Sequence, residues 1–512
     1  MGDRVRHVRP DARVRRTGRL VFLLALAVYL ATTGGSMATD IMSYEVTKGI
    51  VERGTVAMSY NVFGMEAHRG TDGRYYAPYG IGHAIYSVPF YAAARAVERA
   101  TGLAFGKPEV LTKAGFVLGS AYAAALTVWI GFFFAWRLSG SDRSAALAAL
   151  AIGFATFLWP YAKFGFNAPL AALCVTAGTY GVWLGVRADR PLVLVVGGAA
   201  LGGALLVRYE LALVCLPLAV WMAFESRGRG RRLVQWALLA GLPVTAALLV
   251  TLYYNQVRFG NPFDTGYLRD QTLGVGSFWS GLTGLLFSPG RSVVLYSPVV
   301  AAGLEELIAP NRRDRGTRLL LLGQFVVVLC FYASLTNWDG ERSYGPRYLL
   351  PVVPLLVLPL ASAAGGTRSR LLLTFVMVSV IVQLPGVLVD FSKVGAARVI
   401  GPRTETERQW SWQASGLVIN TRASIAAIPD NIGRLMSGSR PQVKPGDTRT
   451  RDFSDQLAFS LDFWWLYAFY LGAFSAAVAV GCGAACWGAV ALLAWTLRAQ
   501  LRAGAMRASD EE

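Results

Sequence analysis

Charged residues are scarce in this sequence. Asp, Glu, Lys and Arg make up only 16% of its 512 residues, whereas hydrophobic residues make up 54%. Apolar runs of about 18 or more residues recur along the whole chain, and runs of this length can cross the hydrocarbon core of a bilayer as helices. The sequence therefore predicts an all-α polytopic membrane protein that has the lipid bilayer as a partner.

Cysteine is also rare, and its five residues indicate neither a disulfide framework nor a metal site. All of them fall within predicted spans, away from the extracytoplasmic loops where an oxidising compartment could pair them; they are Cys174, Cys215, Cys330, Cys482 and Cys486. The last two are four residues apart but have no histidine or carboxylate neighbours. We therefore expect them to pack as small residues and not to bind a metal.

The net charge of +18 is explained by its placement along the chain. Residues 1–19 are crowded with arginine, and a basic segment next to a span is retained on the cytoplasmic side. Alternate connections between spans are arginine-rich as well, as is the C-terminal tail; these connections begin at Arg137, Arg187, Glu225, Asn311 and Thr367. The pattern predicts a plasma (inner) membrane protein with both termini in the cytoplasm, and it accounts for the charge without a nucleic-acid partner.

About twelve helices are expected to span the membrane. The candidate spans are 20–37, 112–136, 144–158, 166–186, 191–206, 211–224, 233–254, 292–307, 318–335, 348–361, 371–389 and 463–497. The last of these is too long for one span unless it tilts or begins at the interface. The basic tail, the apolar run 20–30 and the small residues at 36–38 also resemble a signal peptide, so cleavage stays open as an alternative to a retained first span.

Most of the hydrophilic sequence falls on the extracytoplasmic side. Every cytoplasmic connection has about a dozen residues or fewer, which is too short for a nucleotide-binding domain, and no Walker A or GxGxxG motif follows a strand. We expect a basic tail over 1–19, a transmembrane module over 20–389 with an extracytoplasmic loop at 38–111, an extracytoplasmic loop or small cap over 390–462, and a last helix with its cytoplasmic tail over 463–512. Function is therefore expected at the extracytoplasmic surface.

The first extracytoplasmic loop has the pattern of two interfacial helices. An apolar stripe over 42–50, with charges on the opposite face, predicts a short helix lying in the membrane interface. A second stripe over 81–88 predicts another helix that ends at Pro89. Asp40 lies where the first span leaves the membrane, so these helices would form the rim of a cavity open to lipid. A third candidate helix, over 425–436, either caps this cavity, binds an acceptor or belongs to a loose cover.

Four stretches carry a resemblance to a known family. Asp40 follows the first span, and after a helix containing Tyr44 comes GRYYAPYGIGHAIYSVPFY. Farther along the chain lie YNQVRFGNPFDTGY, GLLFSPGRSVVLYSP and NWDGERSYGPRYLLPVVPLL. These stretches resemble GT-C fold membrane glycosyltransferases, the group of protein mannosyltransferases (glycosyltransferase family 39) and aminoarabinose transferases. The resemblance covers most of residues 20–390, and its motifs are degenerate.

The resemblance implies a membrane glycosyltransferase with a polyprenyl-phosphate sugar donor. Such an enzyme moves the sugar, with inversion, to an extracytoplasmic acceptor, which is a glycan, lipid or protein of the cell envelope. Asp40 would be the catalytic base that removes the proton of the acceptor hydroxyl. Basic side chains would hold the donor phosphate, since a guanidinium can bind two of its oxygens at once; the candidates are Arg208, Arg291, Arg347 and Lys163.

The sequence departs from the family pattern at two places. Many relatives have a Glu after the first-loop Asp, whereas Ile41 stands here, so a second acid would have to be Glu45 or Asp72. The lysine that aminoarabinose transferases carry before a Pro-Pro pair is also missing, and His83 or Lys163 would replace it. Further candidates for lining the cavity are Tyr79, Asp339 and Glu341. A divalent metal held between Asp40 and the phosphate stays open, and no other cofactor is expected.

Each candidate also has a plainer explanation, and other functions stay open. Asp40 can be only the N-cap of the helix that follows it, the arginines can be anchors at the membrane boundary, and tyrosines there usually form an aromatic belt. The chain can instead be a transporter or flippase for a lipid-linked saccharide, but its spans are poor in the polar residues that such a pathway needs. A polysaccharide polymerase or ligase and a non-catalytic scaffold are the remaining alternatives.

Overall fold

The computed structural model describes most of the chain, and the described part is almost entirely helical. It covers residues 9–59, 67–102, 109–267, 274–309, 314–340, 343–363, 366–394, 405–441, 457 and 460–510. Its one sheet is a hairpin of two short antiparallel strands in which His68 pairs with Tyr76 and Arg69 with Tyr75.

The elements follow one another as helices joined by short connections. In chain order they are α2 (Ala12–Ala31), α3 (Ile41–Arg53), β1 (His68–Arg69), β2 (Tyr75–Tyr76), α4 (Gly82–Thr101), α5 (Val110–Ser139), α6 (Asp142–Phe154), α7 (Leu158–Ala162), α8 (Ala168–Arg187), α9 (Pro191–Val207), η1 (Tyr209–Val214), α10 (Cys215–Ser226), α11 (Gly230–Phe259), α12 (Phe278–Phe287), α13 (Val293–Tyr296), α14 (Val299–Ile308), α15 (Arg315–Ala333), η4 (Arg347–Leu349), α16 (Val353–Val357), η5 (Leu358–Ser362), α17 (Gly366–Leu388), α19 (Glu405–Trp410), α20 (Gly416–Ser437), α22 (Trp464–Tyr470) and α23 (Ala476–Asp510).

Seven helical segments of the described chain are long and apolar enough to cross a membrane. They are α5, α8, the continuous pair η1 and α10, α11, α15, the apolar part of α17, and α23. Three shorter apolar segments, α9, α12 and α16 with η5, accompany them. The predicted class, an all-α polytopic membrane protein, is confirmed, whereas the predicted number of twelve spans is not.

Several predicted helices are broken, and the breaks have local causes. The stretch 292–307 forms α13 and α14, separated at Ser297 and Pro298, because proline has no N–H with which to continue the first helix. The stretch 463–497 is not one helix either, since α22 ends at Tyr470 and Gly472 takes a left-handed φ of 83° before α23 begins. The prediction also missed α12, an apolar helix of ten residues.

The loop after α2 contains two helices, and the second is longer than predicted. Helix α3 lies where the apolar stripe placed it. Helix α4 continues through Pro89 to Thr101, although proline removes a backbone hydrogen bond. Its packing against α5 offsets that loss: a Cβ on Gly115 would lie only 2.6 Å from the carbonyl oxygen of Phe90, so the two backbones are in close contact.

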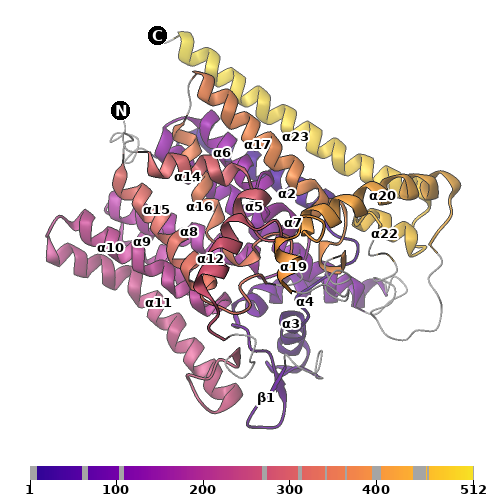
Figure 1. Ribbon diagram of the computed structural model, residues 1–512, viewed down its shortest axis with the longest axis horizontal. Helices are drawn as coiled ribbons and strands as arrows, with labels where there is room; N and C mark the ends of the chain where they lie inside the picture. The colour runs from indigo at the N-terminus through magenta and orange to yellow at the C-terminus, as the bar shows by residue number, and fades with distance from the viewer. Residues whose placement is uncertain are drawn as a thin grey trace.

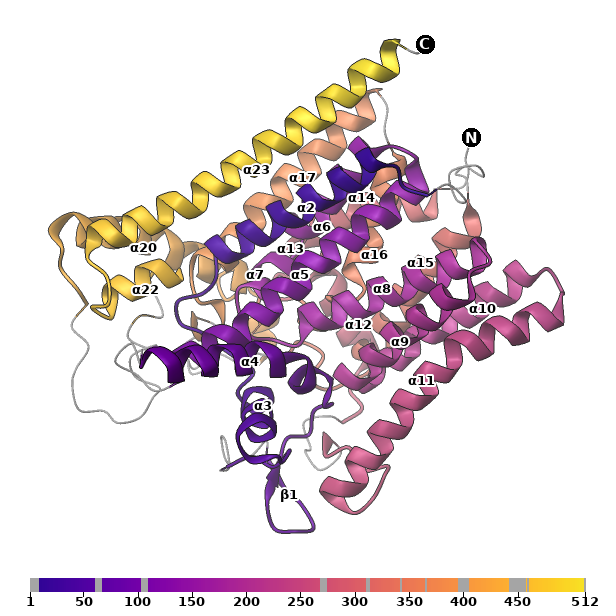
Figure 2. The ribbon, with the colours of Figure 1, turned by 180° about the vertical axis from the view of Figure 1, so that it is seen from behind.

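The two chain ends lie on the same side of the molecule, opposite the β1–β2 hairpin (Figure 1). Viewed from behind, the yellow α23 runs alongside the indigo α2 (Figure 2). Ion pairs tie together the helix ends on the side of the termini, including one between Arg13 and Asp142 at 2.9 Å. Arg187 lies there too, 2.5 Å from Glu225 and 2.9 Å from Asp314. The arginine-rich connections thus share one face, as the charge pattern indicates.

Candidate active site

Asp40 caps the first interfacial helix and is fixed through its backbone and its side chain. Its Oδ2 accepts a hydrogen bond from Ser43 Oγ at 2.8 Å, and Oδ1 accepts one from Ser43 N at 3.4 Å. Its own N–H donates to the carbonyl oxygen of Gly165 at 2.8 Å. The carboxylate is half-buried. The capping role is therefore present in the structure, and it orients a carboxylate that keeps some access to solvent.

The surroundings of Asp40 favour its neutral form. Burial raises the pKa of the carboxyl above its ordinary value, while the two hydrogen bonds from Ser43 and the positive charge of Arg347 pull the pKa back down. A carboxylate with a raised pKa is a stronger base than an exposed one. Arg347, 307 positions later in the chain, therefore acts on the charge of Asp40.

The guanidinium groups of Arg208 and Arg347 both lie close to the ring of Tyr348. The guanidinium carbon of Arg347 lies 5.0 Å from the centroid of Tyr348, and that of Arg208 lies 5.8 Å from the same centroid. Arg208 occupies the extended residue between α9 and η1, so its side chain leaves the helix end. Its Nε and Nη2 donate to Asn167 Oδ1 at 3.1 and 2.8 Å. The structure thus brings Asp40, Arg208 and Arg347 together.

Both arginines retain a buried N–H that bonds to nothing in the described part of the chain. These groups are Nη1 of Arg208 and Nε of Arg347. More than nine in ten buried polar groups in folded proteins have a hydrogen-bond partner, so two unsatisfied donors next to each other are unusual. Neither arginine forms an ion pair with a described carboxylate, and two positive charges with free donors favour an anion.

An aromatic wall supports the two arginines. The ring of Tyr348 stacks on that of Tyr332, with centroids 4.4 Å apart and an angle of 2° between the planes. The Tyr332 hydroxyl in turn donates to Glu210. Glu210 also opposes the positive charge of Arg208, and the stack fixes the ring over which the guanidinium groups lie.

His83 and Tyr79 lie beside this group. His83 is buried, its ring centroid lies 5.0 Å from that of Phe116, and its Nδ1 has no partner among the described residues. Burial, aided by the charge of Arg208, lowers the pKa of His83 to about 3. The side chain is therefore neutral at physiological pH and cannot act as a phosphate-binding cation. Tyr79 is half-buried, near Arg347, with its ring 5.9 Å from that of Tyr267.

Glu45 and Asp72, the two candidates for a second acid, belong to other surroundings. Glu45 is buried on α3, and burial raises its pKa against the opposing charge of Lys48. Asp72 is exposed in the turn of the hairpin, where its Oδ1 accepts from Arg74 N at 3.0 Å and its Oδ2 from the Tyr76 hydroxyl at 2.8 Å. Among the described residues, neither side chain forms a hydrogen bond or an ion pair with Asp40, Arg208 or Arg347. Neither therefore has a role in our proposal.

Arg291 and Asp339 hold a loop together. Arg291 is 2% exposed and donates to the carbonyl oxygens of Asp339 and Ser343 at 2.5 and 3.1 Å, and its Nη2 lies 3.8 Å from Asp339 Oδ2. These bonds shape the segment that leads to Arg347. Both residues therefore act as supports in our proposal, in place of the phosphate and cavity contacts expected from the sequence. Glu341 lies outside the described residues.

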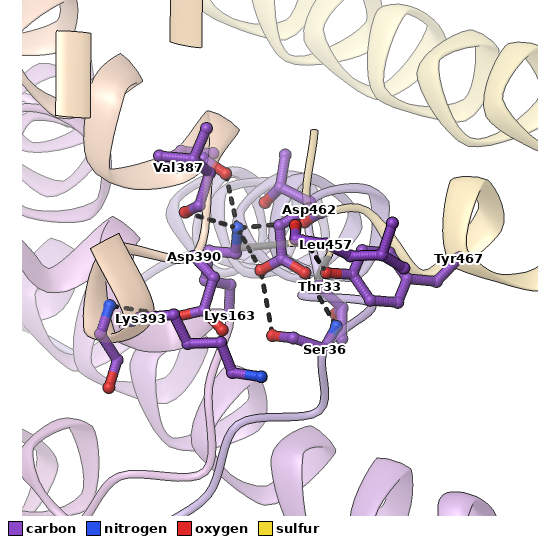
Figure 3. A network of polar contacts seen from close by, with 12 residues as sticks. Thr33, Ser36, Lys163, Val387, Asp390, Lys393, Leu457, Asp462 and Tyr467 are labelled. Carbon is purple, nitrogen blue, oxygen red and sulfur yellow. Dashed lines mark hydrogen bonds and ion pairs between the residues drawn. The ribbon is translucent and has the colours of Figure 1, made fainter. Parts of the chain in front are cut away.

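Lys163 has no exposed surface, and its bonds remain inside the protein (Figure 3). Its Nζ donates to the carbonyl oxygens of Val387 and Asp462 at 2.6 and 3.0 Å and lies 3.0 Å from Asp462 Oδ2. An ammonium group has three N–H donors, and these contacts use them. We therefore assign Lys163 a structural role instead of the predicted phosphate contact.

Sequence reasoning missed several supporting residues. Tyr348 directly follows Arg347 in the GPRY stretch, so its position was available as a signal. Asn167 is the N-cap residue of α8, two positions before Pro169, which marks it only as a helix cap. Asp462 lies 299 residues from Lys163, and no local pattern indicates such a pairing. Among the described residues, no three His, Cys, Asp or Glu side chains gather where they could hold a metal ion.

The solved structures that are similar to this chain include two of the same protein. Both are of ArnT from Cupriavidus metallidurans, an aminoarabinose transferase of the GT-C type. The one bound to undecaprenyl phosphate is 16% identical over 91% of this chain and 77% of that chain, with a TM-score of 0.48. The apo structure is 15% identical over 89% and 77%, with a TM-score of 0.49. Likenesses this distant do not establish an activity. No protein-family model and no curated protein matches the chain.

Proposed function

We propose that this protein is a membrane glycosyltransferase that moves a sugar from a polyprenyl-phosphate donor to an extracytoplasmic acceptor. The observation that carries the proposal is the combination of a half-buried carboxylate, Asp40, with two neighbouring arginines that each keep an unsatisfied buried N–H. The carboxylate suits removal of a proton from the acceptor, and the arginines suit binding of a phosphate. Transfer of a sugar from a phosphate-linked donor requires both. The family resemblance of the sequence supports the same reaction.

Asp40 acts as the general base in this proposal. Its carboxylate takes the proton of the acceptor hydroxyl while the hydroxyl oxygen forms a bond to the anomeric carbon. The bond from that carbon to the phosphate oxygen breaks, and the leaving polyprenyl phosphate keeps the electron pair. Attack from the face opposite the leaving group inverts the anomeric configuration. Ser43 holds the carboxylate in place during the step.

Arg208 and Arg347 bind the phosphate that leaves. The developing negative charge on its oxygens is stabilised by donors that are already oriented, Arg208 by Asn167 and Arg347 by Tyr348. The ring of Tyr79 is available to stack against the sugar. The carrier lipid anchors the donor in the bilayer, so no nucleotide-binding domain is needed. The acceptor belongs to the extracytoplasmic side, which the arginine pattern assigns to the face bearing loop 38–111.

The first test of the proposal compares two aspartates of the same loop. Wild type, Asp40→Asn and Asp72→Asn are purified in detergent and given a panel of undecaprenyl-phosphate-linked sugars, and release of undecaprenyl phosphate is measured. Asp40→Asn is expected to lower kcat by about 10²–10⁴-fold, the usual contribution of a general base. Asp72→Asn undergoes the same chemical change at the exposed turn and should keep activity within about twofold. A folded Asp40→Asn protein with full activity would overturn the proposal.

Binding of undecaprenyl phosphate alone tests the two arginines separately from the chemistry. Arg347→Gln and Arg208→Gln are each expected to weaken binding by about tenfold or more, since a hydrogen bond to a charged group is worth about 1.5–3 kcal/mol. Asp40→Asn should leave this binding largely intact. Repeating the transfer assay with EDTA distinguishes an enzyme that relies on these arginines from one that needs a divalent ion between Asp40 and the phosphate.

A further inference from the structure

A buried ion pair joins distant segments of the chain beside the proposed base. Lys163 and Asp462 approach to 3.0 Å, and neither side chain has exposed surface. The ammonium group also lies 4.8 Å from the ring centroid of Phe164 and 5.8 Å from that of Phe463. Figure 3 shows the pair at the meeting point of the loop after α7, the end of α17 and the segment before α22. None of the proposed catalytic steps uses this pair.

Asp462 also holds the segment that leads to Asp40. Ser36 donates to its carboxylate twice, from N to Oδ1 at 2.8 Å and from Oγ to Oδ2 at 3.3 Å. The second of these oxygens is the one that faces Lys163. One carboxylate therefore ties residue 36, which is four positions before the proposed base, to residue 163.

The backbone next to this carboxylate is bonded to both ends of the segment 163–165. Gly34 N donates to the carbonyl oxygen of Lys163 at 3.1 Å, Gly165 N to that of Ala38 at 2.9 Å, and Asp40 N to that of Gly165 at 2.8 Å. The chain thus turns between Gly34 and Met37, where Met37 N donates to the carbonyl oxygen of Gly34 at 3.3 Å, and then pairs with Gly165 up to Asp40. The packing leaves little room, since a Cβ on Gly34 would lie 2.8 Å from Asp462 Oδ2. A change in the ion pair is therefore expected to shift the backbone that carries Asp40.

Asp462 is itself held in place by the last part of the chain. Its N–H donates to the carbonyl oxygen of Leu388 at 2.8 Å, and Trp464 N donates to that of Thr33 at 3.0 Å. The indole N–H groups of Trp464 and Trp465 donate to the carbonyl oxygens of Leu30 and Ala31 at 3.1 and 3.3 Å. The segment before and within α22 is thus bonded to the end of α2, and these bonds fix the position of Asp462.

We infer that Lys163 and Asp462 are positioning residues: their ion pair fixes residues 34–40 against the segment 163–165 and thereby the location of Asp40. The inference rests on the proposed function, in which Asp40 is the base. Loss of one partner leaves the other charge buried without the group 3.0 Å away that balances it most closely; the buried carboxylate of Asp390 acts on Lys163 as a second, weaker charge. The bonded segments therefore shift, whereas loss of both charges removes most of that conflict. Displacement of a reacting group by about 1 Å can lower a rate by about 10².

Kinetics of single and double variants test the inference with the donor that the wild type accepts. Asp462→Asn and Lys163→Met are each expected to lower kcat by about 10–100-fold while KM for the donor changes by less than about threefold. The double variant Lys163→Met/Asp462→Asn keeps an acceptor for Ser36 N and should recover at least half of the lost factor on a logarithmic scale. Glu225→Gln breaks a partly buried ion pair at the opposite end of the bundle and should leave kcat unchanged. Single variants with wild-type kcat per folded molecule would refute the positioning role.

Thiol labelling gives a second measurement that does not depend on activity. Ala38→Cys places a half-buried thiol in the paired segment, and its reaction with a maleimide is measured above the background of the native cysteines. Asp462→Asn should speed this labelling at least threefold, and the double variant should restore the slow rate. An unchanged rate contradicts the inference even if Asp40 is the base. A faster rate together with an active Asp40→Asn protein contradicts only the proposed function.

Discussion

The charge state of Asp40 depends on very few groups. Burial raises its pKa, and the opposing effects come first from the hydroxyl and N–H of Ser43 and then from Arg347. The Ser43 hydroxyl donates to the carboxylate at 2.8 Å, and a hydrogen bond to the charged form of a group favours that form. Ser43 is therefore the side chain through which the basicity of Asp40 can be changed without altering Asp40 itself.

Ser43→Ala is expected to move the acidic limb of the pH profile of kcat/KM to higher pH. Without the hydroxyl the carboxylate loses a stabilising bond, the pKa of Asp40 rises, and more of the enzyme is protonated and inactive at a given low pH. A bond of about 1.5 kcal/mol corresponds to about one pH unit. Ser43→Thr keeps a hydroxyl and should restore the wild-type limb. His83→Gln should not move it, because the pKa of His83 is already lowered to about 3. An unshifted limb in Ser43→Ala contradicts the assignment of the limb to Asp40.

At this scale the sequence indicated the charged residues better than their partners. Asp40 and Arg347 lie in the stretches that carry the family resemblance, and Arg208 was a candidate because a charge between two apolar runs is unusual. Lys163 has the same local pattern, yet its charge is matched by Asp462 at the other end of the chain. The difference between a charge that faces a ligand and one that faces the protein is set by tertiary contacts, which residue spacing does not contain.

Among the elements, the apolar runs predicted which helices exist, but they did not predict where those helices end or break. Apolar stripes located α3 and the long spans because periodicity and length are local properties. The passage of α4 through Pro89 depends on its contact with α5, and the break between α22 and α23 depends on a left-handed glycine. Helix packing through small residues was also not predicted: a Cβ on Gly198 in α9 would lie 2.1 Å from the carbonyl oxygen of Ala240 in α11.

Gly198→Ala is expected to destabilise the bundle by about 1–3 kcal/mol. An added methyl group would overlap backbone atoms, so α9 and α11 would have to move apart and lose contacts along their length. Gly241→Ala in α11 is the matched control, since a Cβ there meets nothing within 4 Å and alanine favours a helix by about 1 kcal/mol. The midpoint of unfolding in mixed detergent micelles measures both. Equal midpoints for the two variants would show that the α9–α11 contact is looser than the structure indicates.

For the whole molecule, the arginine distribution and the helix arrangement give the same orientation. The ion pairs that link α2 to α6 and α8 to α10 and α15 lie on the side of the two termini, and the β1–β2 hairpin lies on the opposite side (Figure 1). Asp40 follows α2 in the loop that leads to the hairpin. Because basic segments tend to stay in the cytoplasm, we expect this orientation to expose the proposed site to a donor and acceptor outside the cytoplasm.

Labelling of single engineered cysteines tests this orientation. Thr71→Cys lies in the exposed turn of the hairpin, and Arg229→Cys lies in the exposed connection between α10 and α11. In intact cells an impermeant maleimide should label the first and spare the second, and permeabilising the membrane should make both react above the background of the native cysteines, which are only partly exposed. The opposite pattern would place Asp40 on the cytoplasmic face. Asp40 could then still act as a base, but its acceptor would have to be a cytoplasmic molecule, because neither a polar acceptor nor the hairpin can cross the hydrocarbon core unaided.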